Sequence, residues 1–164
     1  MGNYGSNRIK QAGIIREHDI IEKVIAYLRL CKYKVVAEKS SRDIDMHSKI
    51  DYYLLFDEST PFLKSLKVPV DVKSGNSYTV INQKGENSLE NSKSRFIIIN
   101  TVKKPDELLW VSVNKLRECM KIYPPKLYES NDNDSYYMWL DGYVDEHKEF
   151  FGNSVKRVCV NLNK

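Results

Sequence analysis

The stretch Asp45–Gly75, DMHSKIDYYLLFDESTPFLKSLKVPVDVKSG, decides the fold of this chain. It contains two apolar runs, Ile50–Phe56 and Val68–Val72, and the polar connector between them includes Pro61. Short apolar runs rich in β-branched and aromatic residues, separated by a polar segment with a proline, are typical of strands joined by a loop. The stretch therefore predicts two antiparallel strands.

Three charged residues interrupt this otherwise apolar hairpin. If the chain turns near Phe62, Asp51 lies opposite Lys73 and diagonal to Asp71. Side chains alternate along a strand, so Asp71 and Lys73 share one face and Val72 points to the other. Carboxylate oxygens suit Mg²⁺, which takes one or two carboxylates and leaves its other positions to water and phosphate. A lysine beside such an ion can orient or deprotonate an attacking water.

An Asp on one strand followed by Asp-x-Lys on the next resembles the PD-(D/E)XK nuclease superfamily, which includes many restriction enzymes and archaeal Holliday-junction resolvases. The approach to the first of these strands, residues 45–51 (DMHSKID), looks most like that of small, often phage-encoded members. The resemblance covers roughly Ile14 to Lys121. It implies an α/β fold with a restriction-endonuclease-like core, in which helices flank a central mixed β-sheet.

The resemblance also implies a function, the metal-dependent hydrolysis of phosphodiester bonds in DNA. The expected cofactor is Mg²⁺, for which Mn²⁺ can substitute. Asp51, Asp71 and the backbone carbonyl of Val72 would bind the ion, and Lys73 would position or activate the water. Glu22 would complete the site or hold a second metal ion.

Two glutamates in the helix before the hairpin are candidates for the acidic residue that would join the metal site. Apolar residues recur at helical spacing from about Ile14 to Cys31, which predicts an amphipathic helix. Glu22 lies eleven positions before Tyr33, which is the spacing of the acidic residue in the family's first helix. Glu17 lies closer to the centre of the apolar stripe on a helical wheel. A third alternative is that both glutamates are solvated.

Basic residues around the proposed site are candidate phosphate contacts. Lys49 precedes Asp51 by two positions, and Lys84, Lys93 and Arg95 cluster around the polar segment 83–94. Solvated surface charge explains these residues equally well. In the loop before the hairpin, the polar residues are interpreted as turn formers rather than as a second metal cluster: Asp43, Asp45 and His47.

The rest of the chain predicts further strands, a turn, and a second helix that ends at Pro124-Pro125 with Ser112 or Asn114 as its N-cap. The aromatic residues near the C-terminus could stack on unpaired bases, although core packing or an interface between copies explains them better: Tyr136, Tyr137, Trp139 and Tyr143. The predicted strands are Tyr33–Glu38, Tyr78–Asn82, Arg95–Val102, Leu108–Val113 and Val155–Leu162, with a turn at 103–106.

Length and composition are those of one domain, residues 1–164, with a loose arm at residues 1–12. The net charge of +4 is a mild bias toward polyanions such as DNA. The three cysteines are far apart and favour reduced thiols, so the expected location is the cytoplasm, or the host cytoplasm for a viral protein. No apolar run approaches the ~20 residues of a membrane span, so no membrane association is expected. The sequence leaves open whether the chain forms a homodimer.

Two other classes of protein compete with a nuclease. One is a nuclease fold that no longer cuts and serves as a nucleic-acid-binding or partner-protein-binding module. Retention of Asp51, Asp71 and Lys73 argues against it. The other is a purely structural α/β domain, which would show no response to divalent metal ions.

Overall fold

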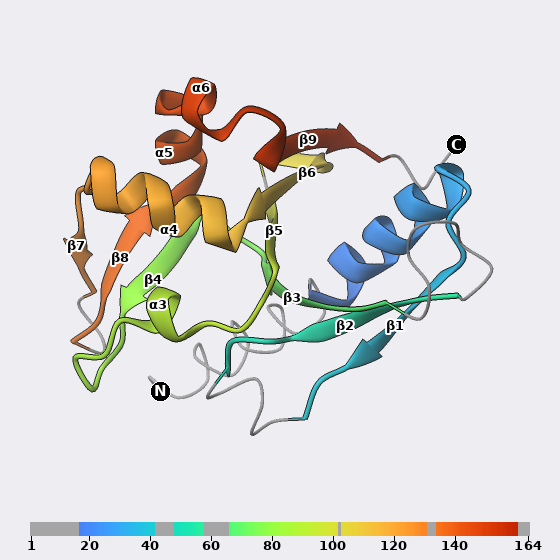
Figure 1. Cartoon of the computed structure of the whole chain (residues 1–164), viewed down its shortest axis with the longest axis horizontal. Helices are drawn as coiled ribbons and strands as arrows, with labels where there is room; N and C mark the ends of the chain where they lie inside the picture. Colours follow the sequence, from blue (N-terminus) through green and yellow to red (C-terminus); the bar gives the residue numbers. More distant parts are fainter. Residues whose placement is uncertain (1–16, 42–47, 58–65, 102, 131–133, 161–164) are drawn as a thin grey trace, which may run out of the picture.

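A six-stranded mixed sheet forms the centre of the protein (Figure 1), in the order β1-β2-β3-β5-β6-β9. Strands β3 and β5 are parallel, and the other neighbouring pairs are antiparallel. The computed structural model describes residues 17–41, 48–57, 66–101, 103–130 and 134–160. The strands of this sheet are β1 (Val35–Lys39), β2 (Tyr52–Phe56), β3 (Lys67–Lys73), β5 (Phe96–Thr101), β6 (Lys104–Ser112) and β9 (Val155–Cys159).

A second, three-stranded sheet has the order β4-β8-β7. Its strands are β4 (Ser77–Ile81), β8 (Tyr136–Trp139) and β7 (Tyr128–Glu129). The helices are the N-terminal helix (residues 17–30), α3 (Ser88–Asn91), α4 (Val113–Ile122), α5 (Leu140–Glu146), α6 (Lys148–Phe151) and the short 3₁₀ helix η1 (Gly152–Ser154).

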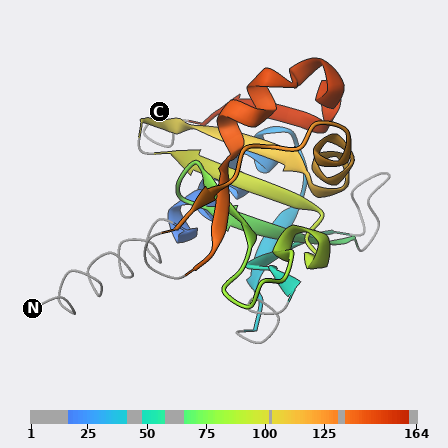
Figure 2. The ribbon, with the colours of Figure 1, turned by 90° about the vertical axis from the view of Figure 1, so that its left-hand side faces the viewer.

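Each face of the large sheet buries a separate apolar cluster. On one face the N-terminal helix packs Ile20 and Val24 against Val70, Val72 and Ile98. On the other face Ile97 and Ile99 pack against the second sheet and against α3, α4, α5 and α6. Figures 1 and 2 show the small sheet and these helices on the side away from the N-terminal helix. The prediction of an α/β domain with a mixed sheet flanked by helices is thus confirmed.

The central hairpin forms as predicted, but in a different register. Strand β2 pairs with β3 through Tyr52 opposite Val70 and Leu54 opposite Val68. Continued by one residue, this pairing places Asp51 opposite Asp71 rather than opposite Lys73. The pairing is centred on position 61 instead of 62, and moving the centre of a hairpin by one residue shifts its partners by two. The two carboxylates are therefore closer neighbours than the sequence indicated.

Most other predicted elements occur within one or two residues of their predicted bounds. The predicted turn at 103–106 is shorter than expected, because Lys103 lies in a turn but β6 already begins at Lys104, which pairs with Thr101 of β5. The buried amide of Asn100 stabilises this extension by donating to the carbonyls of Pro105 and Glu107, at 3.0 and 2.8 Å. Ser112 is the N-cap of α4, where its Oγ accepts from the Lys115 N–H at 3.3 Å.

The C-terminal part differs most from the sequence prediction. The aromatic run continues as strand only to Trp139, and the chain then enters α5 and α6. Tyr143 lies in α5 and is buried, where its hydroxyl donates to the Tyr123 carbonyl at 2.6 Å. Several predictions fall outside the described residues, among them the loose arm at 1–12, the start of the first helix at 14–16 and the last two residues of the final strand. Within the described ranges, no helix is long and apolar enough to cross a membrane.

Candidate active site

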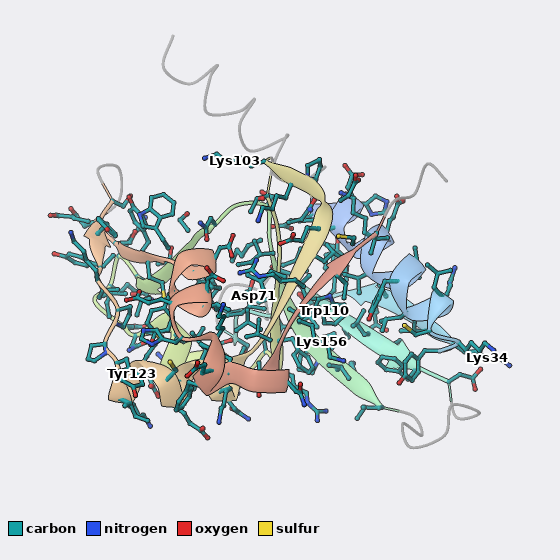
Figure 3. All side chains as sticks on the ribbon, turned by 90° about the horizontal axis from the view of Figure 1, so that it is seen from above. Lys34, Asp71, Lys103, Trp110, Tyr123 and Lys156 are labelled. Atoms are coloured by element: carbon teal, nitrogen blue, oxygen red, sulfur yellow. The ribbon has the colours of Figure 1, made fainter. Side chains whose placement is uncertain are left out.

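Asp71 lies near the middle of the molecule, at the carboxyl end of β3 (Figure 3). Its side chain is buried, and the residue is only 1% exposed. The Tyr78 hydroxyl donates to Asp71 Oδ2 at 2.9 Å, and the Lys73 ammonium lies 3.5 Å from Oδ1. Burial raises the pKa of Asp71 to about 6, with Lys73 opposing that rise and Asp51 adding to it. A nearby positive charge stabilises the ionised form of a buried carboxyl.

Asp51 immediately precedes β2 and is also buried, at 6% exposure. Its Oδ2 accepts the backbone N–H of Val72 at 2.7 Å. Its carbonyl accepts the N–H of Ser40 at 3.0 Å, which anchors the end of the strand to the chain leaving β1. The N–H and C=O of one residue in a strand point to the same side. The Val72 carbonyl therefore points toward the Asp51 side as well.

Lys73 shares the Asp71 face of β3, as the alternation along the strand predicted. Its side chain is 36% exposed, in contrast to that of Asp71, which is buried. The charge of Asp71 raises the pKa of Lys73 above its usual value, against the opposing effect of burial. The lysine is therefore fully protonated at neutral pH and acts as a cation.

Tyr78 and Lys49 extend the cluster toward the second sheet. Tyr78 is completely buried in β4, and burial followed by the Asp71 charge raises its pKa well above the usual value. It therefore remains a neutral donor to Asp71. The Lys49 ammonium lies 4.5 Å from the centroid of the Tyr78 ring and donates to the Thr79 carbonyl at 3.2 Å. Lys49 has a positive φ of 54°, and its carbonyl accepts from Ser94 Oγ at 2.6 Å.

The two helix glutamates occupy different environments. Glu17 is partly buried, and burial raises its pKa, with Asp51 as the next largest contribution and Asp71 also contributing. Glu22 is exposed and pairs with His18 at 3.0 Å on the solvent side of the helix. Five positions on an α-helix correspond to a rotation of about 140°, so the two side chains cannot face the same site. The structure brings Glu17, and not Glu22, toward the carboxylate pair.

No family model, curated protein or solved structure matches this chain.

The other three predicted phosphate contacts lie in different parts of the structure and differ in how close they come to Asp71. Lys84 is exposed in the tight turn after β4, where its N–H donates to Asn82 Oδ1 at 3.0 Å. Lys93 is exposed, and its N–H donates to the Ser48 carbonyl at 2.9 Å, one residue from Lys49. Arg95 precedes β5 and lines an apolar groove beside Phe96 and Trp110, on the face covered by the N-terminal helix. Of the four basic candidates, only Lys49 contacts the residues around Asp71.

The donor set fits a magnesium ion better than a tightly bound zinc ion. Across the described ranges, no group of three or more His, Cys, Asp or Glu side chains converges as a complete metal site. Two carboxylates and a backbone carbonyl are oxygen ligands of the kind that Mg²⁺ takes together with water and phosphate. Asp43, Asp45 and His47 lie outside the described residues.

Sequence reasoning missed the role of Tyr78, which supports Asp71 from a neighbouring strand. The pattern of residues 77–81 predicts a half-buried strand, but nothing in it marks the tyrosine hydroxyl as the partner of an aspartate seven positions earlier. The position of Glu17 in the apolar stripe was the signal for its orientation. A helical wheel locates it better than the family spacing does.

Proposed function

We propose that this protein is a metal-dependent nuclease that hydrolyses phosphodiester bonds of DNA on a restriction-endonuclease-like core. The observation that carries the proposal is the pair of buried carboxylates, Asp51 and Asp71, on neighbouring strands beside the protonated Lys73. Buried charges are rare unless they are paired, and titratable groups with shifted pKa values cluster at functional sites. Two adjacent buried carboxylates lower the stability of the fold, and a purely structural domain would gain nothing from them.

The order of the elements supports the proposal by analogy. A helix and the antiparallel strands β1, β2 and β3 follow one another around the carboxylates, and β5, which comes after β4 and α3 in the chain, is the parallel neighbour of β3. This order corresponds to the opening of the nuclease core that the sequence resembles. One fold can support many unrelated functions, so the chemistry follows from the side chains of the site.

In this proposal Asp51, Asp71 and the Val72 carbonyl hold Mg²⁺, for which Mn²⁺ can substitute. When bound, the ion supplies Lewis-acid stabilisation of the charge that develops on the phosphate. Glu17 is the acidic residue of the N-terminal helix that would complete the site, a role that the family resemblance assigned to Glu22. Because each of the two carboxylates raises the free energy of the other's charged form, a bound cation would favour the doubly ionised pair.

Lys73 acts as a fixed positive charge in this scheme. Because Asp71 raises its pKa, its ammonium does not remove a proton from water at neutral pH. It can donate hydrogen bonds to the attacking water or to a non-bridging phosphate oxygen, and so orient the reacting groups. Tyr78 keeps Asp71 in one orientation by donating to Oδ2, which leaves Oδ1 on the side of Lys73.

The test is a nicking and degradation assay with a panel of supercoiled, linear, branched and single-stranded DNA, with and without Mg²⁺. We expect cleavage only with the divalent ion and its loss in Asp71→Asn, an isosteric change that removes the charge. Asp145→Asn, at an exposed position of α5, is the matched control and should cut like the parent. Cleavage in chelator, or by Asp71→Asn at the parental rate, would rule out the proposed metal site.

A second variant separates chemistry from metal binding. Lys73→Met should lose most cleavage while it still binds the metal, because the lysine donates no ligand to the ion. If Lys73→Met cuts at the parental rate, the lysine is only an ion-pair partner of Asp71. If the protein binds DNA without cutting any substrate of the panel, the non-cleaving binding module is the better description.

A further inference from the structure

The small sheet carries a cluster of aromatic side chains on its outer face. Along β8 the side chains alternate, so Met138 points into the core while Tyr137 and Trp139 point outward. Tyr128 of β7 pairs with Tyr137 of β8. We call the three rings of Tyr128, Tyr137 and Trp139 the aromatic platform.

The rings of the platform pack on one another and remain accessible. Tyr128 stacks on Tyr137 with 5.7 Å between ring centroids, and Trp139 meets Tyr137 edge-on at 5.3 Å. Trp139 is nevertheless 46% exposed. Figure 2 views the molecule from the side on which β4 and β8 lie. Exposed aromatic clusters of this kind mark interaction sites more often than single exposed apolar residues do.

One lysine contacts the platform, and a second contacts the neighbouring strand β4. The Lys126 ammonium lies 5.2 Å from the centroid of the Tyr128 ring. Lys49 donates to the Thr79 carbonyl, and Thr79 is the partner of Tyr137 in the sheet. The acidic residues of the neighbouring elements are Glu129 in β7 and Asp141, Asp145 and Glu146 in α5, and Asp141 pairs with Arg157. Aromatic rings with a cation beside them suit a ligand that combines flat π faces with negative charge.

Strand β4 lies between the platform and the proposed cleavage site. Strand β4 begins four residues after Lys73, and its first residue, Ser77, pairs with Trp139. Lys49 covers the Tyr78 ring, whose hydroxyl holds Asp71. A strand held at the carboxylates can therefore pass Lys49 and reach the rings across a single β-strand.

We infer that the aromatic platform binds unpaired bases of a nucleic-acid strand next to the proposed cleavage site. This inference rests on the proposed function for the role of the neighbouring carboxylates. In a duplex the faces of the bases are stacked on one another, so only unpaired nucleotides can stack on the rings. The substrate class is thus nucleic acid with a single-stranded segment beside the cut, such as a branched, flapped or gapped molecule.

The test uses tryptophan emission, because the chain has two tryptophans and only Trp139 belongs to the platform. Trp110 lies on β6 beside Lys156 of β9 (Figure 3) and serves as the internal control. The Asp71→Asn protein in EDTA is titrated with oligothymidylate, with oligouridylate, and with a duplex of equal length. We expect strong quenching in the Trp110→Phe background and little in the Trp139→Phe background.

Affinity is measured in the same titration by anisotropy of a labelled oligonucleotide. Stacking on one aromatic residue contributes about 1–3 kcal/mol per base, so Trp139→Ala and Tyr137→Ala should each weaken binding about five-fold or more. Trp139→Phe should retain most of the affinity, which separates stacking from a folding defect. Lys126→Gln should reduce the salt dependence of binding. The two oligonucleotide arms show whether DNA or RNA is preferred.

Equal affinity for duplex and single strand, or the absence of Trp139 quenching, would overturn the inference. Concentration-dependent dimerisation that Trp139→Ala abolishes would assign the platform to a second copy of the chain instead. Because binding is measured without metal on an uncleaving variant, its failure is distinct from failure of the nuclease proposal. Quenching by a protein that cuts nothing would keep the platform and reject the nuclease.

Discussion

At the scale of single residues, Asp71 dominates the electrostatics of the site. Its pKa of about 6 lies above the ordinary aspartate value because the carboxyl is buried, and the charge of Asp51 raises it further. In an unfolded chain the same carboxyl titrates near its usual value of ~3.9. Between these two values the folded protein binds more protons than the unfolded chain does. The free energy of unfolding must therefore fall as the pH rises through that window.

This shift predicts how the stability of the metal-free protein depends on pH. In EDTA, the stabilisation from protonated Asp71 should be fully present near pH 4 and lost above about pH 6. The measurement is urea unfolding of the parent and of Asp71→Asn across this range. The difference between the two curves isolates Asp71 from the other carboxyls. Asp51→Asn should shrink this difference without removing it, since burial remains. A parent curve parallel to that of Asp71→Asn would contradict the shift.

The two helix glutamates make a matched pair for a second prediction. Glu17→Gln should lower both cleavage and the apparent affinity for Mg²⁺, because this carboxyl interacts electrostatically with Asp51 and Asp71. Glu22→Gln should leave both unchanged, because Glu22 faces solvent and pairs with His18. Metal titrations of cleavage rate, with circular dichroism as a folding control, measure the effect. The reverse ranking would mean that the spacing of the family, rather than the helical wheel, identifies the functional acid.

The sequence predicted that Asp51, Asp71 and Lys73 come together, but it did not predict the hydrogen bond from Tyr78 to Asp71. Alternation along one strand is a local rule, so Asp71 and Lys73 could be placed on one face from their spacing alone. The register that sets Asp51 opposite Asp71 depends on the centre of a turn, which sequence patterns locate only to within a residue or two. The partnership of Tyr78 with Asp71 links two different sheets, and no local pattern encodes it.

At the scale of elements, the turn between β3 and β4 is held in place by α5. The Asn76 carbonyl accepts the N–H of Leu140 at 2.9 Å, and Asn76 Oδ1 accepts the N–H of Asp141 at 2.6 Å. The side chain thus satisfies a donor at the start of α5, where Trp139 as the N-cap makes no side-chain hydrogen bond. This contact ties the residues that follow Lys73 to the helix after the aromatic platform.

Loss of the hydrogen bond from Asp141 to Asn76 should loosen both the turn after β3 and the start of α5. Asn76→Ala should destabilise the protein by about 1 kcal/mol, the typical value for a capping hydrogen bond, and should lower cleavage. Asn76→Asp keeps the acceptor oxygen and should retain most of the stability. Asn153→Ala, at an exposed position, is the control. Thermal melts and cleavage rates test this link. Full activity in a destabilised Asn76→Ala protein would show that the turn does not help to position Lys73.

The strands were easier to predict than the short helices. Apolar runs such as residues 96–101 are strongly β-like over their whole length. Helices α5 and α6 contain only seven and four residues, and α5 includes a glycine. Helices this short have little intrinsic stability and form because their apolar residues pack against the core, as Leu140 and Phe151 do here. Tertiary packing of this kind is not visible in a local pattern.

At the scale of the whole molecule, the candidate site lies where the two apolar clusters meet the end of the central hairpin. Val70 and Val72 belong to the cluster under the N-terminal helix, while Ile97 and Ile99 beside them belong to the cluster under the second sheet. Asp71 is therefore fixed from both faces at once. A preorganised metal site requires rigid support of this kind. Because the site is tied to both apolar clusters, binding of a metal ion should stabilise the whole domain.

Metal binding should therefore raise the melting temperature of the entire domain. A ligand at ~100 times its dissociation constant stabilises the folded state by about 2.7 kcal/mol. For a chain of this size 1 kcal/mol corresponds to about 2–4 °C, so Mg²⁺ should raise the melting temperature by about 5–11 °C. Thermal melts with Mg²⁺, against a monovalent salt of equal ionic strength, measure this rise.

The variants of the site should divide into two groups in this experiment. Asp51→Asn removes a ligand and relieves repulsion between the carboxylates, so its metal-free form should melt slightly higher than the parent and respond less to Mg²⁺. Lys73→Met should keep the full response or exceed it, because a neighbouring positive charge is gone, and yet it should not cut. An equal Mg²⁺ response in Asp51→Asn and the parent would place the bound ion elsewhere. The nuclease proposal would then lose its metal centre, whatever the cleavage assays showed.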